Sequence, residues 1–191
     1  HGTVVGDWLI VRLMAQEIPT EGLGLEQRGW AGTGSPTFLS LLNVHDHLTE
    51  LFLSHQEALL VDDIELAVAR LREYEAELSV HIRVEEEILL PVYQRAGTIP
   101  GGQPVFFSGE HKKMREFLSR FFKVLERPAP DVATRRRQII ALLDQQAMFK
   151  NLVEHHDQRE RNILYPALDR VTTEAERLDL LAASSDPTSV R

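Results

Sequence analysis

The chain has 191 residues, enough for one domain that buries a sizeable hydrophobic core. Its formal net charge of −8 argues against nucleic acid or an anionic membrane surface as the main partner. The absence of cysteine excludes disulfides, iron–sulfur clusters, thiolate zinc sites and thiol catalysis.

No apolar run reaches the roughly 18 residues that a membrane-spanning helix needs, so we expect no membrane association. The apolar stretch at 8–14 is short, carries an arginine and is not followed by a signal-peptide cleavage site. We therefore expect a cytoplasmic protein.

Residues 1–35 are expected to form an N-terminal extension that precedes the main domain. Residues 3–17 could form a short amphipathic helix, and residues 18–35 are rich in Gly, Thr and Pro, which is typical of a loop. Trp8 and Trp30 could anchor this extension on the main domain. Alternatively, the extension could form a lid over a metal-binding cavity. The extension could equally mediate the formation of a homodimer.

Between residues 36 and 172, helical periodicity recurs in four long segments, without a convincing strand pattern. Short connections between long helices favour an all-α fold, an antiparallel up-down four-helix bundle. A short helix over 173–183 and a polar tail would complete residues 173–191. The expected boundaries are a helix start at Ser35-Pro36, a helix end at Asp62-Asp63 that also caps the next helix, helix ends near Gly97 and Pro128, and a cap at Asp131.

The second and fourth helices each carry a proline inside their apolar pattern. Pro91 and Pro166 each remove a backbone hydrogen bond, so we expect a kink or a helix end near them. The positions expected to be buried around these prolines are Glu85, Ile88 and Val92 in the second helix and Glu160, Ile163 and Ala167 in the fourth.

The most informative pattern is a motif that occurs twice. His81-x-x-x-Glu85 recurs as His156-x-x-x-Glu160, and the tail x-x-Ile-Leu-x-Pro follows each copy. An imidazole and a carboxylate at this spacing lie one turn apart on the same helix face. Buried charge is costly unless it is paired or bound to a metal ion. Two such pairs on apolar faces therefore predict a metal site inside a helix bundle.

The rise of a helix places two further histidines at the same depth. His45 lies about 14 Å and His111 about 10 Å from their helix starts, and Glu85 and Glu160 lie about 16 Å before their helix ends. All four helices therefore bring a histidine to one half of the bundle. The candidate metal ligands are His45, His81, Glu85, His111, His156 and Glu160.

Two of these choices have a rival nearby. A modest rotation of the first helix would exchange His47 for His45, and His155 competes with His156 in the same way. His55 shares the buried face of the first helix but lies about 15 Å further along the axis than His45. We interpret it as a core histidine that forms hydrogen bonds.

Other polar side chains are interpreted as structural. Tyr74, Tyr93 and Tyr165 are expected to pack with their hydroxyls at the rim of the core, and Glu86 and Glu87 to coat a solvated face. One of the tyrosines could instead be redox-active or contact the metal ligands, but nothing in the sequence selects which. The histidines and glutamates of the motif could also be buried polar pairs without a metal ion. Few helical cores, however, carry so many ionisable groups without one.

In order and spacing, these residues resemble the hemerythrin-like, or HHE cation-binding, family. The resemblance covers approximately residues 36–171 and rests on His45 with its following apolar residues, the two His-x-x-x-Glu motifs and the lone His111. It implies a di-iron centre without haem, in which Glu85 and Glu160 bridge two iron ions and the histidines are terminal ligands. Imidazole and carboxylate would also accept manganese or zinc.

The sequence departs from the oxygen carriers of that family in three ways. Arg115 stands four residues after His111, where those carriers have a second histidine. Their last carboxylate follows the last histidine by five residues, a spacing that only the pair His155–Glu160 would restore here. Six ligands instead of seven would leave an extra open position, which favours reactivity over reversible carriage. The cysteine motif of the family's nitrosative-stress branch is absent.

The resemblance implies a soluble di-iron protein that binds or reacts with dioxygen, nitric oxide or peroxide, as a carrier, a sensor or in a stress response. One alternative is a di-iron oxidase or oxygenase that acts on a small organic substrate, which would need an apolar pocket opening onto the metals. Another is metal storage or a structural metal site. The sequence leaves open whether the protein is an enzyme.

Overall fold

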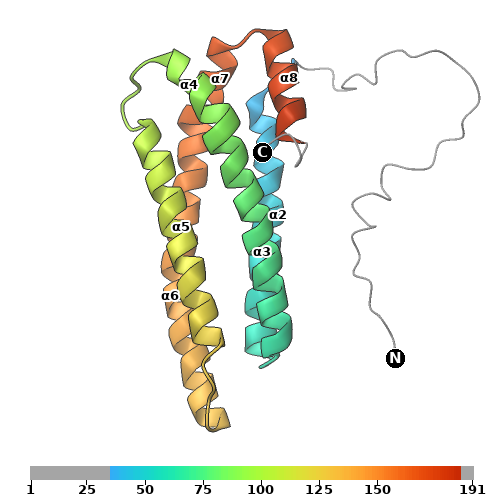
Figure 1. Ribbon diagram of the computed structural model, residues 1–191, viewed down its shortest axis with the longest axis vertical. Coiled ribbons are helices and arrows are strands. Elements are labelled where there is room, and N and C mark those ends of the chain that lie inside the picture. Colours follow the sequence, from blue (N-terminus) through green and yellow to red (C-terminus); the bar gives the residue numbers. More distant parts are fainter. Residues whose placement is uncertain (1–34, 186–191) are drawn as a thin grey trace, which may run out of the picture. The chain divides into compact units, whose positions relative to one another are not determined.

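The computed structural model describes residues 35–185, and every regular element in that range is helical (Figure 1). The predictions for the N-terminal extension, including Trp8 and Trp30, therefore fall outside the described residues, apart from residue 35 itself. The long helices are α2 (Leu42–Leu60), α3 (Ile64–Val84), α5 (Pro104–Leu125) and α6 (Val132–Arg159). The shorter ones are η1 (Phe38–Leu41), α4 (Leu90–Tyr93), η3 (Gln94–Ala96), α7 (Tyr165–Val171) and α8 (Glu174–Ser184).

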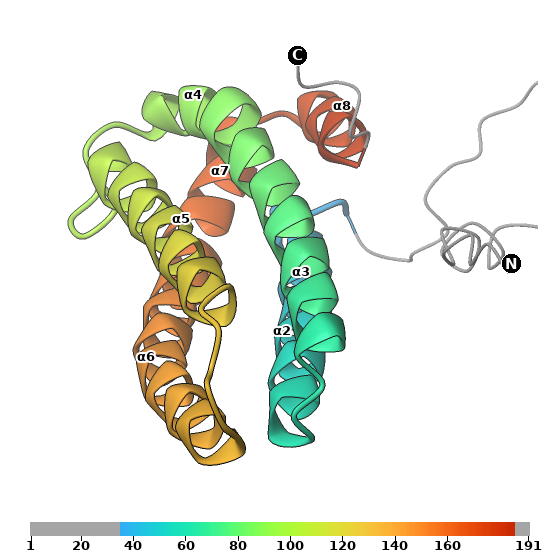
Figure 2. The ribbon, with the colours of Figure 1, turned by 60° about the horizontal axis from the view of Figure 1, so that its bottom comes forward.

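The four long helices lie side by side, and the short helices α4, α7 and α8 gather at one end of them (Figures 1 and 2). α2 packs along α3, α5 packs along α6, and further contacts join α2 to α6 and α3 to α5. The short helix expected over 173–183 is present as α8. Within residues 35–185, no helix combines the length and the apolar character needed to cross a membrane.

Turn and capping residues explain where two of the long helices begin. Asp62 adopts a left-handed backbone with a φ of 60°, which Asp tolerates better than most residues. The carboxylates of Asp63 and Asp131 then cap α3 and α6, because they accept the backbone N–H of Leu66 at 3.0 Å and of Thr134 at 2.7 Å. Both predicted caps are thereby confirmed.

The predicted helix start at Ser35-Pro36 is wrong by two residues. Thr37 is the capping residue of η1, and its hydroxyl accepts the backbone N–H of Leu39 at 3.3 Å. The carboxylate of Asp169 in α7 bonds the Thr37 hydroxyl and accepts the N–H of Phe38 at 3.0 Å. This contact from a distant helix selects the later start, and the local sequence contains no sign of it.

The second and fourth predicted helices each contain one π-helical turn, Glu85–Leu89 (η2) and Glu160–Leu164 (η4). In each, the backbone N–H that follows the turn donates to the carbonyl of the glutamate that begins it, five residues earlier. Pro91 and Pro166 come next, in the first turn of α4 and α7, where a missing N–H costs little. The irregularity expected near each proline is therefore a π turn just before it, followed by the start of a new α-helical segment.

The extra residue in each π turn moves the buried face by one position. Leu89 is fully buried where the sequence pattern predicts Ile88, and Leu164 is fully buried where it predicts Ile163. Ala167 is buried as predicted. The two errors share a cause, because one inserted residue rotates the next side chains by about 100° around the helix axis.

Two hydrophobic clusters fill the core, and a polar layer separates them. On α5, Phe107 belongs to one cluster, Met114 belongs to the other, and His111 lies between them. The same order holds along η1 and α2, where Phe38 belongs to the first cluster, Leu48 belongs to the second, and His45 lies between them. The layer is therefore enclosed by apolar side chains above and below, in an environment where unpaired charge is expensive.

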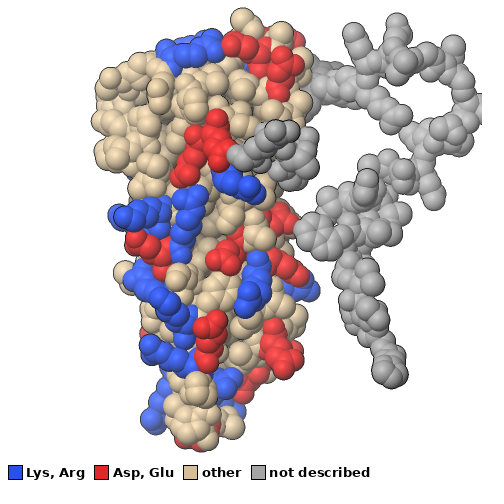
Figure 3. Space-filling view, viewed as in Figure 1, with Lys and Arg blue, Asp and Glu red and all other residues tan. Residues whose placement is uncertain are grey.

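Both signs of charge are interspersed over the face of the helices seen in Figure 3. That face offers no extended basic stripe of the kind that tracks a phosphate backbone. The absence of a nucleic-acid partner stays a prediction from the net charge.

Candidate metal centre

All six predicted ligand side chains converge in the polar layer, where each is at most 8% exposed. Around Glu160, its Oε2 lies 2.9 Å from Nε2 of His45 and its Oε1 lies 2.6 Å from Nε2 of His156. Around Glu85, its Oε2 lies 3.1 Å from Nε2 of His111. The Nε2 atoms of the histidines therefore all face the two carboxylates.

The side chains around Glu160 and those around Glu85 also contact one another, so the layer is continuous. Nε2 of His81 lies 3.6 Å from Glu85 and 3.9 Å from Glu160. It also lies 3.3 Å from Nε2 of His45, and Nε2 of His111 lies 3.2 Å from Nε2 of His156. Residues from α2, α3, α5 and α6 and both π turns thus form one cluster.

The outer nitrogens of two histidines are held by carboxylates. Nδ1 of His156 lies 3.0 Å from Glu110, which also pairs with Arg159 at 3.0 Å. Nδ1 of His111 lies 2.9 Å from Glu86, and Arg115 lies 3.4 Å from the same carboxylate. A carboxylate on Nδ1 fixes the ring orientation and makes Nε2 a better metal ligand. The expectation that Glu86 merely coats a solvated face is wrong.

Tyr165 also lies in the layer, which the sequence did not indicate. Its hydroxyl lies 3.3 Å from Glu85 and 3.2 Å from Glu160, so that it can donate to either carboxylate. The expectation of a packing tyrosine at the rim is wrong for this residue. In the sequence it stands five residues after Glu160, and the π turn brings that position to the inner face.

Asp157 is a second residue that the sequence analysis missed. Its carboxylate lies 3.6 Å from Nδ1 of His45. Burial raises the pKa of Asp157 to about 6, and the charge of His45 only partly opposes this rise. The spacing of three residues between Asp157 and Glu160 is the signal that could have placed both on one face.

The histidines that competed for these positions lie elsewhere. His47 is 50% exposed and lies 3.6 Å from Glu77, and His155 is exposed. His55 is fully buried but far from the layer: its Nδ1 lies 2.7 Å from the carbonyl of Ala67, and its Nε2 faces the amide of Gln146 at 2.8 Å. His55 is thus a core histidine with both nitrogens satisfied, as predicted.

The electrostatics of the layer favour bound positive charge. Burial alone would raise the pKa of Glu160, but the charge of His156 and the close contacts of His156 and His45 with the carboxylate hold that pKa well below its usual range. Burial likewise lowers the pKa of His156, yet Glu160 and Glu110 together hold it well above the usual value. Two buried carboxylates therefore attract a proton or a metal cation.

Two further features fit a metal ion. Oε1 of Glu160 is buried and accepts no hydrogen bond within residues 35–185, although His156 lies close to it. Ligand atoms bound to one ion at about 2.1 Å are about 3.0–3.4 Å apart. The contacts of 3.1 Å between His111 and Glu85 and 2.9 Å between His45 and Glu160 are near that spacing.

The layer contains two overlapping groups of side chains that could each hold an ion. Within each group, the candidate ligand atoms lie within 4.8 Å of one another, and Glu160 belongs to both. The groups are His81, Glu85, His156 and Glu160, and His45, Asp157 and Glu160. A shared carboxylate between two groups is the arrangement that a two-metal site requires.

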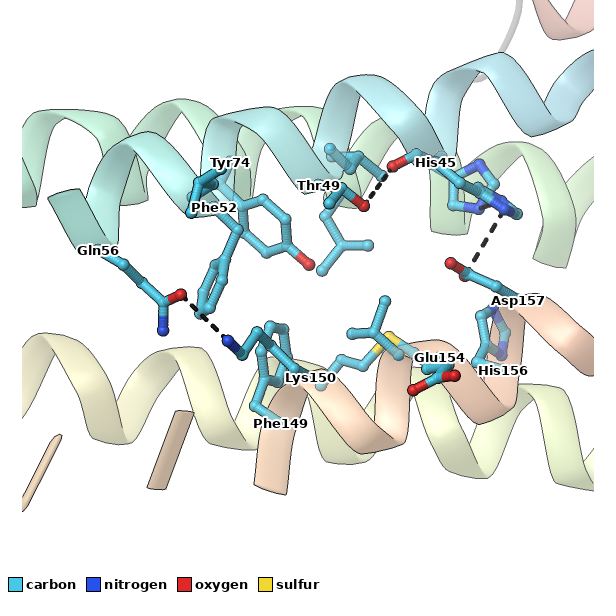
Figure 4. Close-up of a pocket in the computed structure, with 16 residues that line it drawn as sticks. His45, Thr49, Phe52, Gln56, Tyr74, Phe149, Lys150, Glu154, His156 and Asp157 are labelled. Carbon is cyan, nitrogen blue, oxygen red and sulfur yellow. Dashed lines mark hydrogen bonds and ion pairs between the residues drawn. The ribbon is translucent and has the colours of Figure 1, made fainter. Parts of the chain in front are cut away.

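A cavity of about 350 Å³ lies beside the layer, between α2 and α6 (Figure 4). His45, His81, His156 and Asp157 line one end of it. The layer is therefore reachable from outside the core.

No protein-family model matches this chain, and no curated protein or solved structure matches it.

Proposed function

We propose that the described helices form a hemerythrin-like antiparallel four-helix bundle whose polar layer holds two iron ions and binds or reacts with dioxygen, nitric oxide or peroxide. Glu85 and Glu160 would bridge the ions, and His45, His81, His111 and His156 would be terminal ligands. Asp157 is a further candidate ligand beside His45. Manganese or zinc would fit the same donors.

One observation carries this proposal: four imidazoles and two carboxylates meet in one buried layer, with every Nε2 directed at a carboxylate. Oε1 of Glu160 is buried and lies 2.6 Å from Nε2 of His156, yet it accepts no well-directed hydrogen bond within the described residues. A cation would satisfy that atom and cancel the negative charge of the two carboxylates.

The surrounding residues would prepare the layer for this role. Glu110 and Glu86 hold the outer nitrogens of His156 and His111, so that those rings need not reorient when an ion binds. The Tyr165 hydroxyl can donate to a bridging carboxylate or to a small ligand beside it. When bound, a pair of ferrous ions would supply the electrons and the open coordination position for a diatomic ligand.

The first test is the iron content per chain after anaerobic reconstitution with ferrous iron, followed by exposure to dioxygen and nitric oxide. About two irons and a change in the absorption spectrum with either gas would support the proposal. The variant His45→Gln should lose iron, and the matched variant His47→Gln, an exposed neighbour, should not. A folded protein that binds no iron would refute the metal centre. Tight zinc binding without any reaction with dioxygen would indicate a structural metal.

A second candidate function is an oxidase or oxygenase that acts on a small organic substrate. The cavity beside the layer favours it, because a substrate could reach His45 and His156 from the gap between α2 and α6. Oxygen consumption that depends on an added organic compound would distinguish this function from a carrier or a sensor.

A further inference from the structure

The cavity between α2 and α6 differs at its two ends (Figure 4). One end borders the polar layer, and the other is formed by Gln56 and Lys150. Between them the lining is mostly apolar and aromatic, with Phe52, Phe149 and Met114 among its side chains. A volume of about 350 Å³ lies at the small end of the range for small-molecule pockets, about 300–1,000 Å³.

A chain of hydrogen bonds runs inward from the Lys150 end. The amine of Lys150 donates to Oε1 of Gln56 at 3.3 Å, and the amide of Gln56 donates to Gln146 at 3.0 Å. Gln146 then donates to Nε2 of His55, whose Nδ1–H donates to the carbonyl of Ala67. Every donor points the same way along this chain, which fixes the oxygen of Gln56 toward Lys150. The exposed Lys150 amine is thereby directed at the Gln56 end of this chain of hydrogen bonds.

Lys150 has no acidic partner among the residues that the structure describes. Within residues 35–185, no carboxylate oxygen lies within 4.0 Å of its amine, and the amide oxygen of Gln56 is its hydrogen-bond acceptor. Glu154, one turn further along α6, also lines the cavity, but its carboxylate accepts from Gln158 at 3.4 Å and forms no ion pair with Lys150. A positioned cation without a counter-charge at the mouth of an apolar cavity is a suitable partner for an anionic head group.

Tyr74 adds one donor inside the cavity. Its ring is buried against Phe52 and Phe149, and its hydroxyl faces the open space in Figure 4. This hydroxyl forms no hydrogen bond with any described residue. Burial raises the pKa of Tyr74, so the group stays protonated and can donate to a bound molecule.

We propose that this cavity binds a small amphipathic carboxylate, with its carboxylate at Lys150 and its apolar chain extending toward the His45–His156 end. Lys150 and Asp157 are seven residues apart on α6, which corresponds to about 10 Å along the axis. With carbon–carbon bonds of about 1.5 Å, a zigzag chain of about eight carbons spans that length. The position of the chain end beside a metal ion rests on the proposed function, whereas binding in the cavity does not.

The test compares three probes of equal chain length, octanoate, octanol and octylammonium, by calorimetric titration of the full chain. Titrations are made on the protein as purified and again after iron loading. Octanoate should bind about tenfold more tightly than octanol, because its carboxylate forms a charge-assisted hydrogen bond with Lys150. Equal binding of octanoate and octanol, tighter binding of octylammonium, or no binding of any probe would each overturn the proposal.

Three variants locate the binding. Lys150→Met should remove the preference for octanoate while leaving octanol binding unchanged, which also shows that the variant is folded. Lys113→Met, at an exposed lysine on α5 away from the cavity, should behave as the unmodified chain. Leu53→Trp should weaken both octanoate and octanol, because Leu53 lines the cavity and is 45% exposed, so that a larger side chain can cover its mouth. An unchanged preference in Lys150→Met would contradict the assigned head-group site.

The outcome is independent of the proposed metal centre. Octanoate binding without any iron binding would retain the cavity proposal and refute the di-iron centre. Two irons per chain without octanoate binding would do the reverse.

Discussion

The two copies of the motif begin alike and differ in their neighbours. Each has a histidine and a glutamate in the layer, a π turn that starts at the glutamate, and a proline after it. The second copy also brings Asp157 and Tyr165 to the layer. The matching positions of the first copy hold Ile82 and Leu90, which are buried in the two hydrophobic clusters. Asp157 and Tyr165 therefore both come from the second copy, although the Tyr165 hydroxyl reaches Glu85 as well as Glu160.

The repeat therefore specifies the candidate ligands, but the parts of the site contributed by its two copies are not equivalent. Glu160 belongs to both groups that could hold an ion, and Glu85 belongs to one. If two ions bind, we expect unequal affinities. The cavity reinforces this asymmetry, because Asp157 lines it and Ile82, at the matching position of the first copy, does not.

The largest effect is expected when each of the two glutamates is replaced with glutamine in a separate variant. Glu160→Gln should lose both irons, because it removes the carboxylate shared by the two groups, and Glu85→Gln should retain about one. Iron per chain after anaerobic reconstitution measures this, with circular dichroism as the check on folding. Glu87→Gln, at an exposed neighbour, is the control. Equal losses in both variants would show that the two halves are equivalent after all.

A buried histidine outside both copies provides the next test. His55→Leu should lower the free energy of unfolding by about 2 kcal/mol at about pH 8, because it leaves the buried N–H of the Gln146 amide without its partner and removes the side-chain hydrogen bond to the Ala67 carbonyl, which keeps its bond within α3. Chemical denaturation of both proteins in the same metal state measures the difference. Iron content should not change.

The same pair of proteins should show a defined pH dependence. Burial lowers the pKa of His55 below the value of 6.5 that it has in an unfolded chain. Its contribution to stability is therefore complete above about pH 6.5 and is lost as the pH falls through the folded pKa. The advantage of the unmodified chain over His55→Leu should shrink on acidification, and a growing advantage would contradict a neutral, paired His55.

Asp157→Asn tests the first neighbour that distinguishes the second copy. Removing this carboxylate beside His45 should weaken one of the two ions about tenfold and leave the other unchanged. Competition with a metal chelator measures both affinities. Asp144→Asn, at an exposed aspartate on α6, is the matched control, and equal weakening of both ions would argue against a local role for Asp157.

Tyr165→Phe tests the second neighbour and should have the smallest effect. The loss of one hydroxyl donor to the carboxylates should weaken iron binding about fivefold. Tyr93→Phe is a matched control, because the Tyr93 hydroxyl donates to the carbonyl of Gly102, outside the layer. An equal effect of both substitutions would indicate a loss of packing and not of a hydrogen bond at the site.

Periodicity and spacing sufficed for the helices and for the convergence of the six polar side chains. Those properties depend on the constant rise and rotation of a helix, which hold wherever a helix forms. The caps at Asp63 and Asp131 were equally readable, because a capping side chain acts on its own backbone within three residues. The metal, its ligand and the biological role stay predictions.

What sequence reasoning could not supply depends on contacts between distant segments. Tyr165 and Leu164 face inward because a π turn inserts one residue, and the choice between an α turn and a π turn is made by packing around the layer. Glu86 and Glu110 reach His111 and His156 from other helices, at spacings that no local pattern encodes. The amino-acid pattern alone thus establishes helices with a buried row of histidines and glutamates. Tertiary packing selects which neighbours join them, because rotation and register between helices are set by side chains far apart in the chain.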